Sequence, residues 1–562
     1  MSRTNVLIVG AGPTGLTLAI ELASRGVAVR VIDKSPEHFP GSRGKGLAPR
    51  SREVFDNLGI QDQVQRSGWE HLAYRRWANG ELLSDSDKTP DPAAGIPYAT
   101  GILIAQWRVE EILREKLAEY DVIVNLGSEL TEFTQSVDAV TATLGTGEEI
   151  VADYLVGCDG GRSTVRKSVN VGFEGESGPQ AMLIGDVLVE GLEPDAWYMW
   201  SDSTKGFVAL CPFRDWPAWQ FQAVRISDFS ASGELPPPTI ELFQEIFDDI
   251  AAIPGVKLSD PSWLSTYRIN VRMADKFRFD RVFLAGDAAH VHPPAGGLGM
   301  NTGIQDAHNL GWKLALVLSG KADQTLLDTY NEERVPIAEW TLGVSAKELR
   351  AIGDALDGKT QDDAAHDGGT AVERPTERGF RPRGELQQGQ LALGYRWSPL
   401  AKTLVERPEA APQAGDRAPD SPCQTETGEP LRLFDLFRQP NFTLLGFGEE
   451  TRETIEAAIA QHPVLTTAHL VKTLTESNVN MQHIASVDVV HVAGVDVPHV
   501  EGGDVPPVGG VDVVDVEGHA HREYAVSEPT LFLVRPDGHI GVVADPARGQ
   551  AVLDYLTDLG KN

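Results

Sequence analysis

The glycine-rich segment GAGPTG at residues 10–15 restricts the fold of this chain more than any other feature. It follows the apolar run Val6–Val9, which is typical of a buried parallel strand, and it precedes a helical pattern over Leu16–Ser24. A second apolar run, Ala28–Ile32, ends at Asp33. This order of strand, turn, helix, strand and acid predicts a βαβ unit that binds a dinucleotide.

Each glycine of this turn has a physical task. Gly10 permits the tight turn, Gly12 lets the backbone approach a pyrophosphate, and Gly15 lets the helix and strand pack closely. The pyrophosphate would lie on the helix N-terminus, where free amides and the helix dipole favour anions. Asp33 is expected to accept hydrogen bonds from ribose hydroxyl groups. The turn predicts an adenine dinucleotide and does not distinguish FAD from NAD.

Two later segments also read as a strand followed by a turn and a helix. The apolar run 153–157 leads to Asp159-Gly160, and Ser163 is expected to cap the helix that follows. The apolar run 281–285 ends at Gly286-Asp287, and a helix is predicted to run from about 300 to about Ser319.

The three segments together resemble the aromatic-hydroxylase family of FAD monooxygenases, the p-hydroxybenzoate hydroxylase-like class A enzymes. The resemblance rests on GAGPTG at 10–15, CDGGRSTVR at 158–166 and AGDAAHVHPPAGGLGMNTGIQDAHNLGWKLA at 285–315, and covers residues 1 to about 345 directly. The long third motif is most similar to phenol and polyketide hydroxylases. A second dinucleotide fingerprint and paired redox cysteines are missing, as expected for a family that binds NAD(P)H without a Rossmann unit of its own.

The resemblance implies an α/β fold with a Rossmann-type FAD-binding domain, an inserted antiparallel-sheet substrate domain and a C-terminal thioredoxin-like domain. The expected boundaries are 1–178 for the first part of the FAD-binding domain, 179–272 for the substrate sheet, 273–395 for the second part with long helices and a linker, and 396–562 for the thioredoxin-like domain.

The resemblance also implies roles for residues near the flavin ring. Asp287 would bind the ribityl chain, and Pro294 would lie against the reactive N5/C4a edge. The backbone amides of Met300 and Asn301 would face O2 and N1, where the reduced flavin carries negative charge.

Further family positions surround the rest of the cofactor. Arg43 would lie beside the pyrophosphate and Gln106 would reach the phosphate and ribityl region, while a surface salt bridge and a helix cap are their plainer alternatives. Asp159 would contact FAD and assist the nicotinamide donor. The remaining cofactor-binding positions are Gly10, Gly12, Pro13, Thr14, Gly15, Asp33, Lys34, Gly296 and Gly299.

The chemistry implied by the family belongs to the cofactor. NADH or NADPH reduces FAD, O2 adds at C4a, and the hydroperoxide transfers oxygen to a phenolic or polycyclic aromatic substrate. The protein must exclude water and hold the ring near C4a, and no protein nucleophile is required. The sequence does not identify a base for the phenol, and neither His290 nor His292 is assigned that task. Baeyer–Villiger oxygen insertion, a dehydrogenase or reductase without oxygen transfer, and a nucleotide-binding structural protein remain alternatives.

Residues 180–270 lack the α/β alternation and are the expected substrate region. The stretches 207–213 and 219–224 alternate as antiparallel strands do. Part of the aromatic side chains here are expected to be core, and part to line an apolar pocket on the sheet face toward the flavin. The aromatic residues of this region are Trp197, Tyr198, Trp200, Phe207, Phe213, Trp216, Trp219 and Phe221.

The last third of the chain predicts another unit, beginning after 412–420. It has apolar strands at 442–447 and 468–471, and a hairpin over 531–540 with the turn Pro536-Asp537-Gly538. This unit resembles the thioredoxin-like tail of larger family members, with Pro529 where that fold often has a cis proline. Gly448-Glu449-Glu450 stands where thioredoxin has CxxC, so the unit is expected to be redox-inactive. The Val-Asp-Val repeats within 486–518 predict a solvated low-complexity loop, with no metal site at its scattered histidines.

Charge and cysteine content limit the partners and the compartment. The 562 residues include 49 basic and 81 acidic side chains, for a net charge of −32, which disfavours nucleic acid and anionic membranes. Three widely spaced cysteines favour a reducing cytoplasm, and no apolar run approaches the roughly 20 residues that a membrane helix needs, so a soluble protein is expected. Met1 leads within a few residues into an apolar strand, which predicts no secretory leader. A chain of 562 residues is too long for one hydrophobic core, so two to four structural units are expected. A homodimer is an expectation from the family alone.

Overall fold

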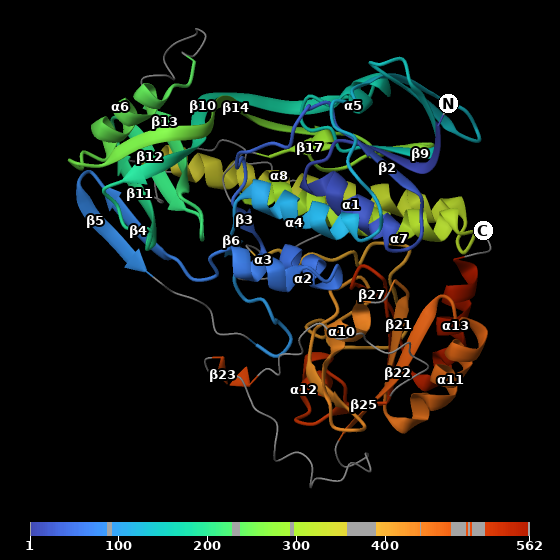
Figure 1. The fold of residues 1–562 in the computed structure, drawn as a ribbon. Coiled ribbons are helices and arrows are strands. Elements are labelled where there is room, and N and C mark those ends of the chain that lie inside the picture. Colours follow the sequence, from blue (N-terminus) through green and yellow to red (C-terminus); the bar gives the residue numbers. More distant parts are fainter. Residues whose placement is uncertain are drawn as a thin grey trace.

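The computed structural model describes most of the chain. The described residues are 2–86, 93–226, 237–292, 297–356, 389–438, 440–473, 491–492, 495–496 and 512–559. The fold is mixed α/β and is built on three large sheets (Figure 1).

The first sheet contains the predicted βαβ unit. Strand β1 pairs in parallel with β2 on one side and with β9 on the other, and β16 pairs in parallel with β9. Its strands are β1 (Ser2–Val9), β2 (Val29–Ile32), β7 (Leu130–Gln135), β8 (Val140–Leu144), β9 (Glu149–Gly157), β15 (Arg278–Phe279) and β16 (Val282–Leu284). Helices α1 (Pro13–Ala23) and α7 (Leu298–Leu318) pack against each other beside this sheet. The predicted parallel strands, the first helix and the long helix ending near 319 are therefore confirmed.

The second sheet has the order β17-β14-β10-β13-β12-β11-β4-β5. Its neighbours are antiparallel except for β11 and β4, and the predicted strands at 207–213 and 219–224 are confirmed as β12 and β13. The strands are β4 (Ala73–Ala78), β5 (Glu81–Ser86), β10 (Phe173–Glu190), β11 (Ala196–Asp202), β12 (Gly206–Pro212), β13 (Ala218–Arg225), β14 (Lys257–Ala274) and β17 (His290–Val291). Strands β4 and β5 come from a segment far before 179 in the chain and extend this sheet beyond the 179–272 region.

Helix α6 (Ile240–Ile250) covers one face of the second sheet. It begins at the cap Thr239, whose hydroxyl accepts from the Leu242 amide at 3.2 Å. Its apolar side packs on Trp200 and Phe221, among other alternate strand residues. Because successive side chains of a strand point to opposite faces, the residues between these belong to the other face.

The third sheet has the order β18-β27-β26-β21-β22-β25-β19-β20 and lies beneath α7 and α2 in Figure 1. The predicted strands at 442–447 and 468–471 and the 531–540 hairpin are confirmed as β21, β22 and the pair β26–β27. Its strands are β18 (Lys402–Thr403), β19 (Pro422–Thr425), β20 (Pro430–Arg432), β21 (Phe442–Phe447), β22 (Thr466–Thr473), β25 (Val513–Asp515), β26 (Thr530–Val534) and β27 (Ile540–Ala544). The helices of this unit are α10 (Leu433–Phe437), α11 (Arg452–Gln461), α12 (His519–Glu523) and α13 (Gly549–Asp558), with short 3-10 turns at Glu449–Thr451 and Pro546–Arg548. No peptide bond of the described residues is cis, and this includes the bond before Pro529.

The other elements connect these sheets. They are β3 (Gly46–Leu47), β6 (Ile102–Leu103), α2 (Pro49–Asn57), α3 (Gln61–Ser67), α4 (Gln106–Ala118), α5 (Thr164–Ser168), α8 (Asp328–Leu356), the 3-10 turns Gly286–Ala288 and Gln324–Leu327, and the short strands β23 (His491–Val492) and β24 (Val495–Asp496). Apart from β23, β24 and the residues from 512 onward, the 486–518 repeat segment predicted to be a loop lies largely outside the described residues. Among the described helices, none is long and apolar enough to cross a membrane.

A buried ionic cluster joins the third sheet to α7 and α8. Arg535 on the hairpin pairs with Glu333 of α8 at 2.7 Å, and Glu333 also accepts from Lys313 of α7 at 2.7 Å. Asp537 accepts from the Trp312 indole at 3.1 Å. All of these side chains are buried, so the charges neutralise one another across the interface instead of being solvated.

Candidate functional site

The glycine-rich turn between β1 and α1 leaves room at one position and none at two others. Gly10 has φ +107°, and a Cβ there would lie 2.3 Å from the Cys158 carbonyl oxygen. A Cβ at Gly15 would lie 2.0 Å from the Gly10 carbonyl oxygen. A Cβ at Gly12 would meet nothing within 4 Å, and α1 begins there with Pro13 and no side-chain cap. The turn is thus packed behind and open in front, where free amides of the helix can receive a phosphate.

The acid at the end of β2 closes this turn. The Ala11 amide donates to Asp33 Oδ2 at 2.8 Å, and the Ser35 amide donates to Oδ1 at 2.9 Å. Lys34, the next residue, is exposed on the surface. Asp33 therefore holds the turn and lies beside it, where a ribose would follow the pyrophosphate.

Asp159 lies at the end of the neighbouring strand β9. Its Oδ2 accepts from the amides of Thr164 and Val165 at 2.7 and 3.2 Å, while its buried Oδ1 has no hydrogen-bond partner among the described residues. Ser163 caps α5, as predicted, by accepting from the Arg166 amide at 2.9 Å.

The loop before β3 meets the start of α4. The Gly44 amide donates to Gln106 Oε1 at 3.0 Å, and Gln106 Nε2 donates to Glu110 Oε1 at 2.8 Å. Burial raises the pKa of the Glu110 carboxyl group to about 7. Arg43 is exposed, lies over the Phe39 ring at 4.7 Å, and forms no ion pair within the described part of the chain. The guanidinium group is therefore available to a ligand.

The beginning of α7 converges on the same loop. Gly297 precedes it with φ +62° and no side-chain cap is present. Asn301 is buried, and its Oδ1 accepts from the Ala48 amide at 2.7 Å while its Nδ2 donates to the Gly46 carbonyl at 3.1 Å. A Cβ on Gly44 would lie 3.6 Å from Met300 Cε.

Other residues that were predicted to bind the cofactor lie near the start of α7. Asp287, in the turn after β16, has a solvent-accessible side chain, although the surrounding protein raises the pKa of its carboxyl group by desolvation. Gly299 lies next to His292, because a Cβ at position 299 would be 3.5 Å from the His292 Cβ. Thr14 lies against the same turn, since a Cβ on Gly286 would be 2.6 Å from Thr14 Oγ1. Pro294 and Gly296 lie outside the described residues.

A buried polar chain behind this loop was not anticipated from the sequence. Asp306 of α7 accepts from Arg334 Nε at 2.7 Å and from the Gly286 amide at 3.0 Å, and it pairs with His290 Nε2 at 2.7 Å. His290 Nδ1 lies 2.9 Å from His292 Nε2. Arg334 and His290 together outweigh burial and lower the pKa of Asp306 to about 2, whereas burial holds the pKa of His292 well below its ordinary value. These hydrogen bonds connect the turn after β16 to α8, so His290 has a structural role.

The face of the second sheet opposite α6 contacts the loop that carries Arg43. Lys45 Nζ donates to Gln220 Oε1 at 2.7 Å and to Gln222 Oε1 at 2.9 Å, both on β13. Tyr198, Trp200, Trp219 and Phe221 of the predicted aromatic group belong to the core under α6, and Phe213 is also buried. Trp197 and Phe207 alternate with these residues and are only half-buried. Trp216 is exposed and packs on Trp107, with ring centroids 4.7 Å apart.

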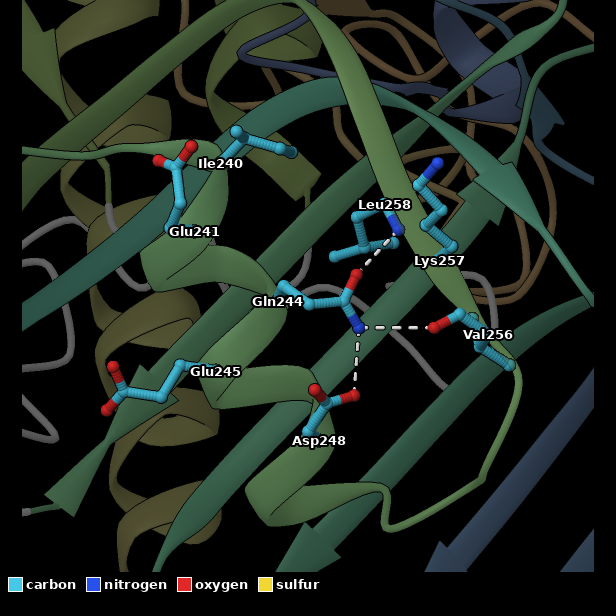
Figure 2. Close-up of a pocket in the computed structure, with 8 residues that line it drawn as sticks. All are labelled: Ile240, Glu241, Gln244, Glu245, Asp248, Val256, Lys257 and Leu258. Atoms are coloured by element: carbon cyan, nitrogen blue, oxygen red, sulfur yellow. Dashed lines mark hydrogen bonds between the residues drawn. The ribbon is translucent and has the colours of Figure 1, made fainter.

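A surface hollow of about 620 Å³ lies on the opposite, α6 side of the second sheet (Figure 2). Figure 2 shows Gln244 at its centre, donating to Asp248 and to the Val256 carbonyl and accepting from the Leu258 amide. Gln244 bonds three of the lining residues, Glu245 pairs with Arg225 outside the hollow, and the walls belong to α6 and the start of β14. This hollow is separate from the glycine turn, Arg43 and the start of α7.

These residues fit an FAD dinucleotide. Gly12 and α1 offer space and amides for a pyrophosphate, Asp33 stands where the ribose would follow, and the unpartnered Asp159 oxygen and uncapped α7 offer further polar contacts.

Comparison with known proteins identifies the class. The FAD binding domain family matches residues 3–344. A flavin-dependent monooxygenase of Mycobacteroides abscessus is 38% identical over 98% of this chain and 99% of its own length. Pentachlorophenol 4-monooxygenase of Sphingobium chlorophenolicum is 34% identical over 80% of this chain and 81% of its own. Among solved structures, aklavinone-11 hydroxylase in complex with FAD and aklavinone has a TM-score of 0.75 and 26% identity over 100% of both chains.

The chain therefore belongs to the FAD-binding family of class A aromatic hydroxylases. It is an FAD-dependent monooxygenase, as the sequence motifs predicted.

Proposed function

We propose that this enzyme hydroxylates a phenolic or polycyclic aromatic ring and consumes NADH or NADPH and O2. The supporting observation is the face of the second sheet opposite α6, where the half-buried Trp197 ring lies against Lys45 of the loop that carries Arg43. Similar proteins support the same proposal, because their names give pentachlorophenol and aklavinone as their aromatic substrates.

Bound FAD would supply the redox chemistry, which is reduction by NAD(P)H followed by use of O2 to oxygenate the ring. The chain would supply the rest. Gly12, the first amides of α1 and Arg43 would hold the pyrophosphate, with Pro13, Thr14 and Gly15 forming the same turn. Asp33, beside exposed Lys34, would bind the ribose.

The remaining positions would hold the flavin end of the cofactor. Asp287 and Gln106 would bind the ribityl region, and Asp159 would use its unpartnered oxygen. The amides of Met300 and Asn301 at the start of α7 would stabilise negative charge on the reduced ring. Pro294, with Gly296 and Gly299, would shape the wall beside it.

The architecture would serve these steps. We assign residues 1–178 and 273–395 to the FAD-binding domain, 179–272 to the substrate sheet, and 396–562 to a thioredoxin-like domain without CxxC, which acts in packing or in a homodimer. The substrate sheet would exclude water from the ring that reacts. A cytoplasmic location fits the need for NAD(P)H.

Three measurements test the proposed function. Purified protein should be yellow with bound FAD, and one or more phenols should raise its NADH or NADPH oxidation sharply. With labelled O2, one labelled oxygen atom should appear as a new ring hydroxyl in the product. An ester or lactone product would mean Baeyer–Villiger insertion, and reduction without labelled product would mean a dehydrogenase, so either result contradicts the proposal.

A further inference from the structure

Lys45 is a buried cation whose partners are neutral. It is 8% exposed, and its Nζ donates to the side-chain amide oxygens of Gln220 and Gln222. Nζ also lies 4.3 Å from the centroid of the Trp197 ring, a cation–π contact. Within the described residues no carboxylate lies within 4.0 Å of Nζ, and two of its three N–H groups are used.

The surroundings compensate this charge only in part. Asp186 on β10 and Cys211 on β12 are the titratable groups that act on Lys45 by charge, and burial lowers the pKa of Lys45 to about 8. Burial also raises the pKa of Asp186 to about 7 and that of Cys211 to about 11. At neutral pH the lysine is therefore mostly charged, the thiol is neutral, and the carboxyl group is only partly ionised.

Among the described residues, Asp186 forms no ion pair with Lys45 within 4.0 Å. It is 1% exposed and lies beside Ser42 and Trp263, without a hydrogen bond of good geometry among the described residues. It acts on Lys45 through charge at a distance, without a hydrogen bond. Since a buried cation is costly unless an anion or several dipoles accompany it, the third N–H of Lys45 favours an anionic oxygen from a ligand.

The neighbouring side chains define what kind of molecule carries that oxygen. Trp197 and Met199 on β11, and Tyr74 on β4, are half-buried on the same face of the sheet, and the Tyr74 hydroxyl lies 3.5 Å from Met199 Sδ. Aromatic rings and a thioether favour a flat apolar ring system. The site thus combines an aromatic wall with one cation.

We propose that Lys45 binds the phenolate oxygen of the substrate and so selects the ionised form of the ring for hydroxylation. This inference rests on the proposed function. Gln220 and Gln222 orient the ammonium group, and Gln220 Nε2 in turn donates to the Ser42 carbonyl. A phenolate is richer in electrons than a phenol, so it is the better acceptor of an electrophilic oxygen. No proton is transferred to the protein, since the anion is bound from solution.

The test uses oxidised FAD-loaded enzyme without NAD(P)H and two phenols whose anions differ in colour from their neutral forms, 4-nitrophenol and alizarin. Wild-type enzyme should lower the pKa of at least one bound dye by about one unit or more, which is about a tenfold preference for the anion. Lys45→Met should abolish this shift and weaken anion binding about tenfold or more, while retaining FAD. Lys45→Arg should restore part of the shift.

Two further variants sharpen the result. Lys205→Met, which removes a surface lysine paired with Asp249 of α6 at 2.9 Å, is the matched control and should leave the shift unchanged. Asp186→Asn removes an opposing charge and should strengthen anion binding.

Several outcomes would overturn the assignment. They are the absence of any shift with both dyes in wild-type enzyme, a full shift in Lys45→Met, loss of FAD in that variant, or weaker anion binding in Asp186→Asn. Because dye binding needs no turnover, a normal shift with no labelled product would contradict only the proposed function. Labelled product without the shift would contradict only the role of Lys45.

Discussion

At the residue scale, the glycines of the turn at 10–15 differ in why a larger residue would not be tolerated. At Gly10 and Gly15 a Cβ would overlap backbone atoms of the protein itself, so those positions are required by the fold. At Gly12 the protein offers free space and an extended backbone with φ −76°, which any residue can adopt. The fold itself therefore does not require glycine at position 12, and we expect a bound ligand to require it.

This difference predicts that Gly12→Val gives a folded protein that binds FAD poorly. The isopropyl group fits the apoprotein but occupies the path of the pyrophosphate, so FAD affinity should fall about tenfold or more. Fluorescence titration of apoprotein with FAD measures the affinity, and circular dichroism checks the fold. Gly343→Ala on α8, where a Cβ also meets nothing within 4 Å, is the control and should bind FAD normally. Wild-type affinity in Gly12→Val would place the pyrophosphate elsewhere.

Residues differ in how far the sequence could predict them. The Ser163 cap and the tight positions of Gly10 and Gly15 act through local geometry, so spacing along the chain was enough. The bonds of Asp33 to the Ala11 and Ser35 amides were not predicted. Lys45 gave no such signal, because a lysine in a Gly- and Ser-rich loop is ordinarily solvated. Its burial depends on Gln220, which lies 175 residues later in the chain.

At the scale of elements, α7 departs from the usual rule for helix faces. Its polar residues Asn309 and Lys313 are buried, although polar side chains on a helix ordinarily face water. The reason is that Glu333 of α8 and Asp537 of the β26–β27 hairpin accept their hydrogen bonds, while Arg535 of the hairpin pairs with both of these acids. The helix could be predicted from its periodicity, but its covered side could not, because the covering hairpin is remote in sequence.

The same hairpin predicts a pH effect on stability. Burial lowers the pKa of His539 to about 4, against an ordinary value of 6.5, with Asp537 opposing the shift and Arg50 and Arg535 adding to it. Between these values the unfolded chain binds the proton and the folded protein does not, so stability falls as pH drops from about 7 toward 4. The full loss from this group is on the order of 3 kcal/mol.

Thermal unfolding of wild type and His539→Gln between pH 7.5 and 5 measures this effect. The variant lacks the titration, so its melting temperature should fall less with acidification than that of the wild type. His519→Gln, at a partly exposed histidine of α12, serves as the control and should follow the wild type. Equal pH dependence of wild type and His539→Gln would mean that His539 is not held neutral.

At the scale of the whole molecule, the third sheet is bound to the rest through charges that neither side could bury alone. Besides the Glu333 cluster, Arg417 bonds Glu53 of α2 at 2.7 Å, and Arg432 bonds Asp56 at 2.9 Å. Separating the units would break these pairs and would also expose the apolar surface where Trp312 of α7 packs on Phe442 of β21. Glu53 and Asp56 lie hundreds of residues before their partners, so these ion pairs tie the third sheet to the N-terminal part of the chain.

We therefore expect one cooperative thermal transition for the whole chain. Flavin release, followed by fluorescence, and loss of secondary structure, followed by circular dichroism, should coincide. Glu333→Gln should shift flavin release and loss of secondary structure to lower temperature together. It should reduce the free energy of unfolding by about 3–5 kcal/mol, because Lys313 and Arg535 lose the charge of their shared partner. Glu119→Gln, in the exposed pair with Lys116, should change neither. Two separate transitions in the wild type would show that the third sheet folds on its own.

The ionic cluster around Glu333 also sets an order of events during protein synthesis. Lys313 and Glu333 are translated first, and Arg535 is not translated until 202 residues after Glu333. At roughly 5–20 residues per second, the growing chain spends about 10–40 s with the packing side of α7 and α8 uncovered and its charges incompletely matched. The N-terminal βαβ unit can form while this happens, yet the cofactor-holding half cannot reach its final state until the hairpin has been translated. A stalled or prematurely ended messenger would thus yield a chain dependent on chaperones, instead of a smaller working flavoprotein.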